Sequence, residues 1–90
     1  MPSFVAETYV PSGDRDRLAT EIDGIRAAEQ NATAAEGRVH HVRSYVVPSD
    51  EMGFHIFEAE RASDVVRLLT AAGIEVERVV ESIGLGQGSD

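Results

Sequence analysis

The stretch Arg38–Ala59, RVHHVRSYVVPSDEMGFHIFEA, decides the fold. Residues 38–47 are rich in valine and tyrosine, which favour β-strands. Residues 54–59 are a second short apolar and aromatic run. The residues between them, Pro48–Glu51, are turn-forming types. This stretch therefore predicts an antiparallel hairpin in the middle of the chain.

An amphipathic helix is expected on the N-terminal side of the hairpin. Apolar side chains recur at helical spacing from Arg15 onward, which favours a helix with one buried stripe. That stripe comprises Leu18, Ile22, Ile25, Ala28 or Glu29, and Ala32, and leaves Glu21 on the solvated side. Ser12 or Asp14 can cap the first turn, and Gly37 can end the helix. Ahead of the helix, residues 4–10 are predicted to form the first strand.

A second helix and a last strand are expected on the C-terminal side. Ser63 can cap this helix, and Gly73 stands where a helix-ending glycine usually lies. Residues 74–83 are predicted to form the fourth strand. Residues 84–90 contain three glycines and are expected to be a flexible tail.

The predicted order, β-α-β-β-α-β, is that of the α+β ferredoxin-like fold. We therefore expect a four-stranded antiparallel sheet with two helices on one face, in a single domain of residues 1–83. The first and third strands are neighbours in this fold. Many such domains pair through the helix-free face as dimeric α+β barrels, so a homo-oligomer is expected.

The charge balance excludes several classes of function. Sixteen acidic residues face eight basic ones, all arginine, which gives a net charge of −8. This argues against nucleic acid, which needs clustered cations, and against anionic membranes. The absence of cysteine rules out disulfides and thiolate sites. Neither a signal peptide nor a spanning helix is recognisable in the sequence. We therefore expect a cytoplasmic protein without an organic cofactor, with metal cations open as ligands.

The helix-free face of the predicted sheet carries the candidate site. A hairpin turn between residues 50 and 51 would pair Tyr45 with Ile56. Alternation along the strands then places five side chains on this face: His41, Arg43, Tyr45, Ile56 and Glu58. Because the first and third strands are neighbours, Glu7 is expected near Glu58.

These side chains allow more than one chemistry. Two carboxylates and an imidazole can hold a divalent cation, and Glu7, His41 and Glu58 are such a set. The same groups can act as general acid and base. The structural alternative is a cross-strand ion pair between Arg43 and Glu58, with Tyr45 packed beside it.

The other two histidines are candidate ligands only in a site shared between subunits. Adjacent residues on a strand point to opposite faces, so His40 and His41 cannot chelate one ion from a regular strand. His55 is expected on the helix side near a sheet end. A half-buried histidine with satisfied hydrogen bonds is the alternative there.

Short motifs along the chain resemble a small bacterial family, the domain of unknown function 4242. Ser44-Tyr45-Val46 stands where the family reads Ser-Tyr-Val, and Phe57-Glu58-Ala59 where it reads Tyr-Glu-Ala. Ala72–Val79 stands where it reads Ala-Gly-x-Pro-x-Asp-x-Ile/Val. Glu7 matches a glutamate that the family tends to place before a proline-containing turn. The resemblance covers about residues 3–83.

The resemblance implies a ferredoxin-like oligomer with a link to nickel, since the family includes nickel-responsive and nickel-binding proteins. This chain differs from the usual pattern at three potential ligand positions. His41 stands where an aromatic residue, often tryptophan, is common, His55 where cysteine is common, and Arg43 where histidine is frequent. Ni²⁺ or another divalent cation is the ligand that the resemblance implies.

Three functions follow as expectations. The first is a metal-binding protein that holds a divalent cation on the helix-free face. The second is a dimeric α+β barrel enzyme of the isomerase, cyclase or cofactor-free oxygenase type. In it, Tyr45, His41 and Glu7 or Glu58 would supply acid and base around an apolar pocket. The third is a non-catalytic oligomerisation module. All three expect a partner to cover the helix-free face.

Overall fold

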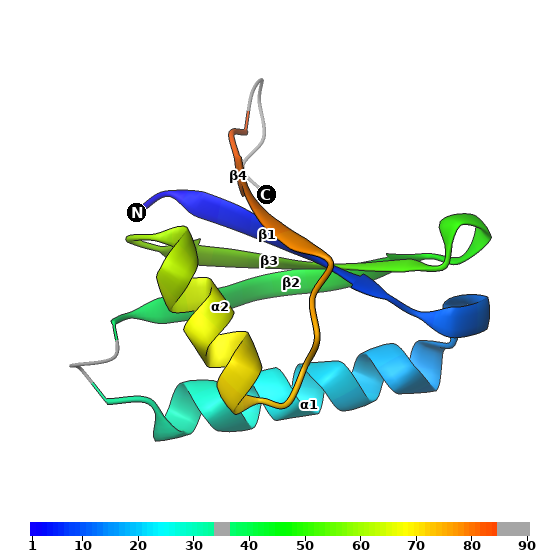
Figure 1. The fold of residues 1–90 in the computed structure, drawn as a ribbon, viewed down its shortest axis with the longest axis horizontal. Helices are drawn as coiled ribbons and strands as arrows, with labels where there is room; N and C mark the ends of the chain where they lie inside the picture. The colour runs from blue at the N-terminus through cyan, green and yellow to red at the C-terminus, as the bar shows by residue number, and fades with distance from the viewer. Residues whose placement is uncertain (34–36, 85–90) are drawn as a thin grey trace.

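The computed structural model describes residues 1–33 and 37–84. In chain order the elements are β1 (Ser3–Tyr9), η1 (Pro11–Gly13), α1 (Arg15–Asn31), β2 (Val39–Val47), η3 (Pro48–Asp50), β3 (Met52–Ala59), α2 (Ala62–Ala71) and β4 (Arg78–Ser82). The strands form one antiparallel sheet in the order β2-β3-β1-β4. Both helices lie on one side of it (Figure 1). The predicted α+β ferredoxin-like fold is confirmed.

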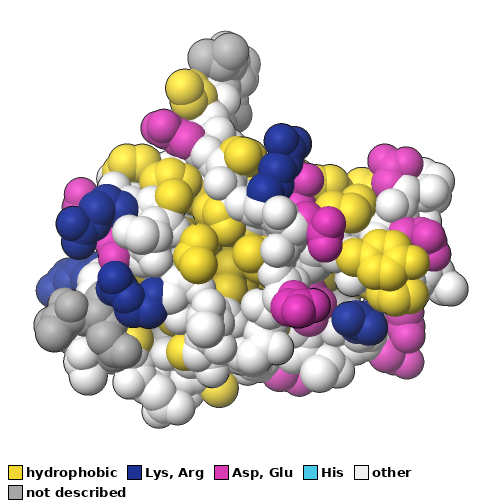
Figure 2. Space-filling view, viewed as in Figure 1, with side chains coloured by type: hydrophobic (Ala, Val, Ile, Leu, Met, Phe, Trp, Pro, Cys, Tyr) yellow, Lys and Arg dark blue, Asp and Glu magenta, His cyan; other side chains and the backbone are white. Residues whose placement is uncertain are grey.

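The core lies between the sheet and the two helices. Every second residue of β1 and β3 is buried there, as alternation requires. The core cluster comprises Phe4, Ala6, Ile25, Phe57, Ala59, Val65, Leu68 and Leu69. Figure 2 shows hydrophobic side chains in the middle of one side of the molecule, bordered by arginine and acidic groups. Neither described helix has the length and apolar character that crossing a membrane requires.

Helix α1 begins as predicted but ends early. Asp14 is its N-cap, and the carboxylate accepts a hydrogen bond from the Asp16 backbone N–H at 2.9 Å. The helix ends at Asn31 rather than near Gly37. Gly37 instead has a φ of +88° and packs against Asp64, where an added Cβ would lie 2.7 Å from the carboxyl carbon. The glycine is needed for this close approach, not for ending the helix.

The predictions for the C-terminal third need two corrections. Helix α2 begins at Ala62, so Ser63 lies inside the helix and is not its cap. Strand β4 covers only Arg78–Ser82, not residues 74–83. Ile74 and Val76 reach the core from the preceding loop, because the chain must first cross from the helix layer to the sheet. Of the predicted tail, residues 85–90 lie outside the described residues.

The hairpin between β2 and β3 is tighter than predicted. Strand β3 begins at Met52, two residues before the expected start, and Val47 lies opposite it. The turn is a short 3-10 helix followed by Glu51, whose φ is 53°. As a result Tyr45 lies opposite Phe54, not Ile56. A shift of two residues leaves each side chain on its predicted face, because the side-chain period of a strand is two.

Candidate functional site

The sheet side away from the helices, which we call the open face, carries an apolar and aromatic set together with charged groups. The apolar and aromatic side chains are Val5, Tyr9, Tyr45, Val47, Met52, Phe54, Ile56 and Val80, and the polar ones include Glu7, Arg43, Glu58 and Arg78. A hollow of about 310 Å³ lies on it and is lined by the apolar Val5 and Ile56, by Arg43, and by Tyr45, whose ring is apolar and whose hydroxyl is polar. The described end of the chain, at Ile83 and Gly84, also borders this hollow.

Four of the five residues predicted to share the open face do so. They are Arg43, Tyr45, Ile56 and Glu58, as the strand register shows. The Tyr45 ring packs against Phe54, with ring centroids 5.5 Å apart. Arg43 lies opposite Ile56 rather than opposite Glu58, which has His40 across from it.

Glu7 and Glu58 are both on the open face, but they are not neighbours. Glu7 lies opposite Phe54 on β3, whereas Glu58 lies opposite Ser3. Four residues of strand separate them, which corresponds to about 13 Å. The Glu7 carboxylate instead accepts a hydrogen bond from Arg78 Nε at 2.9 Å. The prediction that the two glutamates lie together is wrong, because it assumed only that their strands are adjacent.

His41 is on the helix side, contrary to the prediction. The pairing of β2 with β3 shifts by one residue between His41 and Arg43, which is a β-bulge at Val42. A bulge moves every residue beyond it to the other face relative to a regular strand. His41 consequently lies opposite Phe57, and its ring centroid is 5.4 Å from that of Phe57. The bulge removes the imidazole from the predicted metal set.

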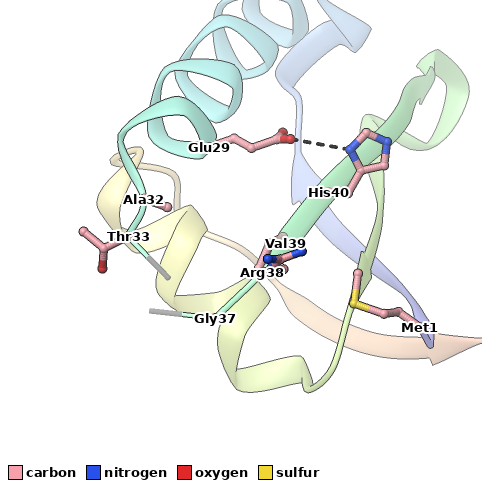
Figure 3. A pocket seen from close by; sticks show the side chains of 8 residues that line it. All are labelled: Met1, Glu29, Ala32, Thr33, Gly37, Arg38, Val39 and His40. Atoms are coloured by element: carbon pink, nitrogen blue, oxygen red, sulfur yellow. Dashed lines mark ion pairs between the residues drawn. The ribbon is translucent and has the colours of Figure 1, made fainter. Parts of the chain in front are cut away.

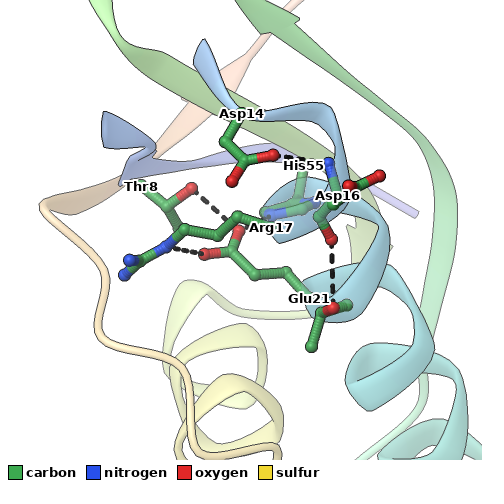
Figure 4. Close-up of polar contacts among 7 residues, drawn as sticks. Thr8, Asp14, Asp16, Arg17, Glu21 and His55 are labelled. Carbon is green, nitrogen blue, oxygen red and sulfur yellow. Dashed lines mark hydrogen bonds and ion pairs between the residues drawn. The ribbon is translucent and has the colours of Figure 1, made fainter. Parts of the chain in front are cut away.

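A buried polar cluster lies on the helix side, centred on the Glu21 carboxylate of α1. Its Oε1 accepts hydrogen bonds from His55 Nε2 at 2.9 Å and from the Thr8 hydroxyl at 3.1 Å (Figure 4). Arg17 Nε lies 4.0 Å from the other carboxylate oxygen. The His55 side chain is fully buried, and that of Glu21 is 12% exposed. His55 is on the predicted side of the sheet, but it is fully buried and in the middle of β3.

Ser44 extends this cluster towards the edge of the sheet. Its hydroxyl lies 2.5 Å from His55 Nδ1 and 2.7 Å from His41 Nε2. The two imidazole rings meet edge to face, with centroids 6.2 Å apart. Glu21, His55, Ser44 and His41 therefore form one continuous hydrogen-bonded row, which we call the polar row.

Burial lowers the pKa of His41 below its ordinary value of 6.5. The neighbouring His55 and Arg26 lower this pKa further, whereas Glu29 and a hydrogen bond with the Arg43 backbone oppose them. A buried imidazolium loses its hydration, so the neutral ring is favoured. His41 is therefore neutral at pH 7, when its ring nitrogens serve as one donor and one acceptor.

His40 lies outside the polar row. It is largely exposed, and its Nδ1 is 3.5 Å from Glu29 Oε2. This pair borders an open hollow of about 500 Å³ between the end of α1 and the start of β2 (Figure 3). Met1 and Arg38 also line this hollow. Glu29 also accepts a weak hydrogen bond from the His41 backbone N–H at 3.4 Å.

The predicted metal ligands are thus divided among several places. Glu7, Glu58 and His40 are on the open face or its rim, and His41 and His55 are in the polar row. Within the described ranges 1–33 and 37–84, no group of three or more histidine, aspartate or glutamate side chains is arranged to hold a metal ion.

Sequence reasoning missed three members of the polar cluster: Thr8, Glu21 and Ser44. The signal for Glu21 was present. It stands three residues after Leu18 and four before Ile25, and both of these side chains are buried. That spacing places Glu21 at the margin of the apolar stripe rather than on the solvated side.

Comparison with known proteins supports the fold. The crystal structure of SCO4226 from Streptomyces coelicolor A3(2) superposes with a TM-score of 0.74, over 94% of this chain and 99% of that one. The two sequences are 21% identical. No family model matches the chain, and no curated protein matches its sequence. The similarity to SCO4226 establishes a shared fold.

Proposed function

We propose that the protein works as a homodimer whose open faces pack together and enclose a binding site for a small organic acid. The observation that carries this proposal is the apolar character of the open face. Tyr9 and Tyr45 are 50% and 48% exposed, and Val5, Phe54 and Ile56 on the same face are only partly buried. Covering such surface contributes roughly 25 cal/mol per Å². A second copy offers the same surface in a self-complementary arrangement.

The hollow on the open face supports the proposed ligand class. Its volume of about 310 Å³ suits a small molecule. Val5 and Ile56 offer an apolar surface for the body of such a molecule. The Arg43 guanidinium and the Tyr45 hydroxyl offer donors for a carboxylate, and guanidinium–carboxylate hydrogen bonds are among the stronger ones in proteins. In a dimeric α+β barrel, two such hollows would face one another and exclude water.

Light scattering coupled to size-exclusion chromatography tests the dimer. The native chain should elute with twice the mass of 9.7 kDa at micromolar concentration. Ile56→Glu and Tyr45→Glu each place a carboxylate on the open face and should shift the protein to the monomer. Val66→Glu is the matched control, because Val66 is 42% exposed on α2 and lies outside the proposed interface. A native monomer, or dimers of all three variants, would contradict the proposal.

Saturation-transfer NMR with a panel of small carboxylates and their amine analogues tests the ligand class. Carboxylates with an apolar body should bind, and the amines should not. Arg43→Gln should weaken binding by about 10- to 100-fold, the value of a hydrogen bond to a charged group. Arg38→Gln, outside this hollow, is the control and should leave binding unchanged. If no carboxylate in the panel binds the native dimer, the ligand class is wrong.

Nickel binding, which the family resemblance implies, stays a prediction. Its test is a calorimetric titration of the native protein with NiCl₂. Saturable binding at micromolar concentration would favour a cation over an organic acid as the ligand. A titration without heat beyond dilution would count against nickel.

A further inference from the structure

The polar row joins a surface hollow to the interior. The hollow, of about 270 Å³, lies at the outer edge of β2 and is lined by Arg26, Glu29, Gln30, His40, His41 and Val42. From His41 the row passes through Ser44 and His55 to Glu21, with N···O distances of 2.7, 2.5 and 2.9 Å. His41 is partly buried and His55 is fully buried. His41 at one end of the row thus borders a hollow, His55 in its middle is fully buried, and Glu21 at the other end is 12% exposed.

The Glu21 carboxylate sets the direction of the hydrogen bonds. An ionised carboxylate only accepts, so His55 Nε2 must donate to it. When His55 is neutral, its Nδ1 accepts from the Ser44 hydroxyl. The Ser44 oxygen then accepts from His41 Nε2–H, and the lone pair of the His41 ring is on Nδ1. Each contact of the row has one donor and one acceptor in this arrangement.

One additional proton reverses the two bonds at Ser44 without moving a side chain. The proton binds His41 Nδ1, the Nε2 proton of His41 passes to Ser44, and the Ser44 proton passes to His55 Nδ1. His41 ends neutral with its hydrogen on Nδ1. His55 ends as an imidazolium whose Nε2–H still donates to Glu21. The net change is one proton bound, and no electrons are exchanged.

The groups that face His41, the imidazole at the outer end of the polar row, disfavour a positive charge on its ring. Arg26 and Glu29 face it from α1, and His55 faces it from β3. Burial is the largest effect on the pKa of His41, and His55 and Arg26 act in the same direction, with only Glu29 and the Arg43 backbone opposing them. A proton that arrives there is therefore held weakly.

The groups that face His55, the inner ring of the polar row, include a carboxylate within hydrogen-bond distance. Glu21 faces it from α1, with Oε1 2.9 Å from Nε2. Arg17 lies 4.0 Å from the other oxygen of that carboxylate, but its side chain is 54% exposed and its charge is screened. Thr8 from β1 donates to the same carboxylate, and the Ser44 hydroxyl from β2 can accept from Nδ1–H. An imidazolium at this position has a carboxylate partner and two satisfied ring nitrogens.

We propose that His41, Ser44, His55 and Glu21 form a one-proton relay between the surface hollow and the buried His55–Glu21 pair. The relay makes that hollow a site for acid–base chemistry on a small polar molecule. The molecule gives its proton to His41, and the proton is stored on His55, where it is out of contact with solvent. Ser44 is the essential link, because its hydroxyl is donor and acceptor at once. This site is on the helix side of the sheet and is independent of the open face.

Nitrogen-15 NMR of the histidine rings tests the relay, since it reports which ring nitrogen carries a proton. The native protein is titrated from pH 8 to pH 5 in the presence of a chelator. The relay predicts that His55 becomes an imidazolium while His41 stays neutral and changes from the Nε2–H to the Nδ1–H form. Both changes should follow one titration curve.

Substitutions at Ser44 separate the relay from a merely structural row. Ser44→Ala should abolish the change of tautomer at His41, and Ser44→Thr, which keeps the hydroxyl, should restore it. Ser49→Ala, an exposed serine in the β2–β3 turn, is the control and should behave as the native chain. A native His41 that keeps its Nε2–H form throughout would overturn the proposal. A Ser44→Ala variant that titrates like the native protein would overturn it as well.

Discussion

Replacing Glu21 by alanine measures how much the buried polar cluster stabilises the fold. The change leaves the His55 Nε2–H and the Thr8 hydroxyl without their acceptor. These residues are 0% and 1% exposed, and an unsatisfied buried donor costs about 1–3 kcal/mol. The 12% exposure of Glu21 lets water reach one side of the cluster, so we expect a loss of about 3 kcal/mol for both donors together. The half-exposed Arg17 pair adds little to this.

Urea unfolding at pH 7 is the assay. For a domain of this size ΔG falls by about 1 kcal/mol per molar urea, so the midpoint should fall by roughly 2–3 M. Asp23→Ala is the matched control, since it removes an exposed carboxylate from the same helix, and it should change stability by less than about 0.5 kcal/mol. Glu21→Gln keeps an acceptor oxygen and should lose about 1 kcal/mol. Equal midpoints for Glu21→Ala and Asp23→Ala would refute the reasoning.

Further predictions concern Gly53 and Gly24, the ion pair between Arg78 and Glu7, and the His41 ring. A Cβ at Gly53 would lie 2.8 to 2.9 Å from three side-chain atoms, so Gly53→Ala should lower the free energy of unfolding by about 1–3 kcal/mol. A Cβ at Gly24 meets nothing closer than 3.5 Å, so Gly24→Ala should raise it by roughly 1 kcal/mol; urea unfolding that gives both changes the same sign would contradict this pair. Arg78→Ala removes the 2.9 Å contact with Glu7, but the arginine is 65% exposed. Its loss should cost only about 0.2–1 kcal/mol, and thermal unfolding should show the difference shrinking in 1 M salt. In Ser44→Ala, which interrupts the relay, the His41 ring should bind a proton less tightly than a free imidazole, because burial lowers its pKa below 6.5; a His41 midpoint above that value in an NMR titration of this variant would argue against the burial.

The residues of the open face show what strand alternation in the sequence can predict. Its residues on β3 and on the second half of β2 were predicted correctly although the register was wrong by two. The error was harmless because side chains repeat every two residues along a strand. Ile56 and Tyr45 therefore keep their predicted face in the structure.

The predicted metal set failed where the strand departs from regularity. One extra residue at Val42 moves His41 to the helix side. Neither valine nor its neighbours give a clear sign of a bulge, since no glycine or proline marks it. The separation of Glu7 from Glu58 was likewise undetectable, because the order of strands says which are adjacent but not how far they slide along one another.

By itself, the sequence determined the order of the elements, the fold class and the start of α1 at Arg15, while leaving its cap open between Ser12 and Asp14. These depend on periodicity and on contacts between residues close in the chain. Only the tertiary structure decided which polar groups meet. Glu21 and His55 are 34 residues apart, and their contact depends on how α1 lies across the sheet. Ser44 and His41 both join them because the bulge at Val42 puts residues 41 and 44 on the same side of an edge strand, where a regular strand would put them on opposite sides. The alternation of apolar and polar residues predicts which face a regular strand buries. A one-residue bulge changes that face while leaving little trace in the sequence around it.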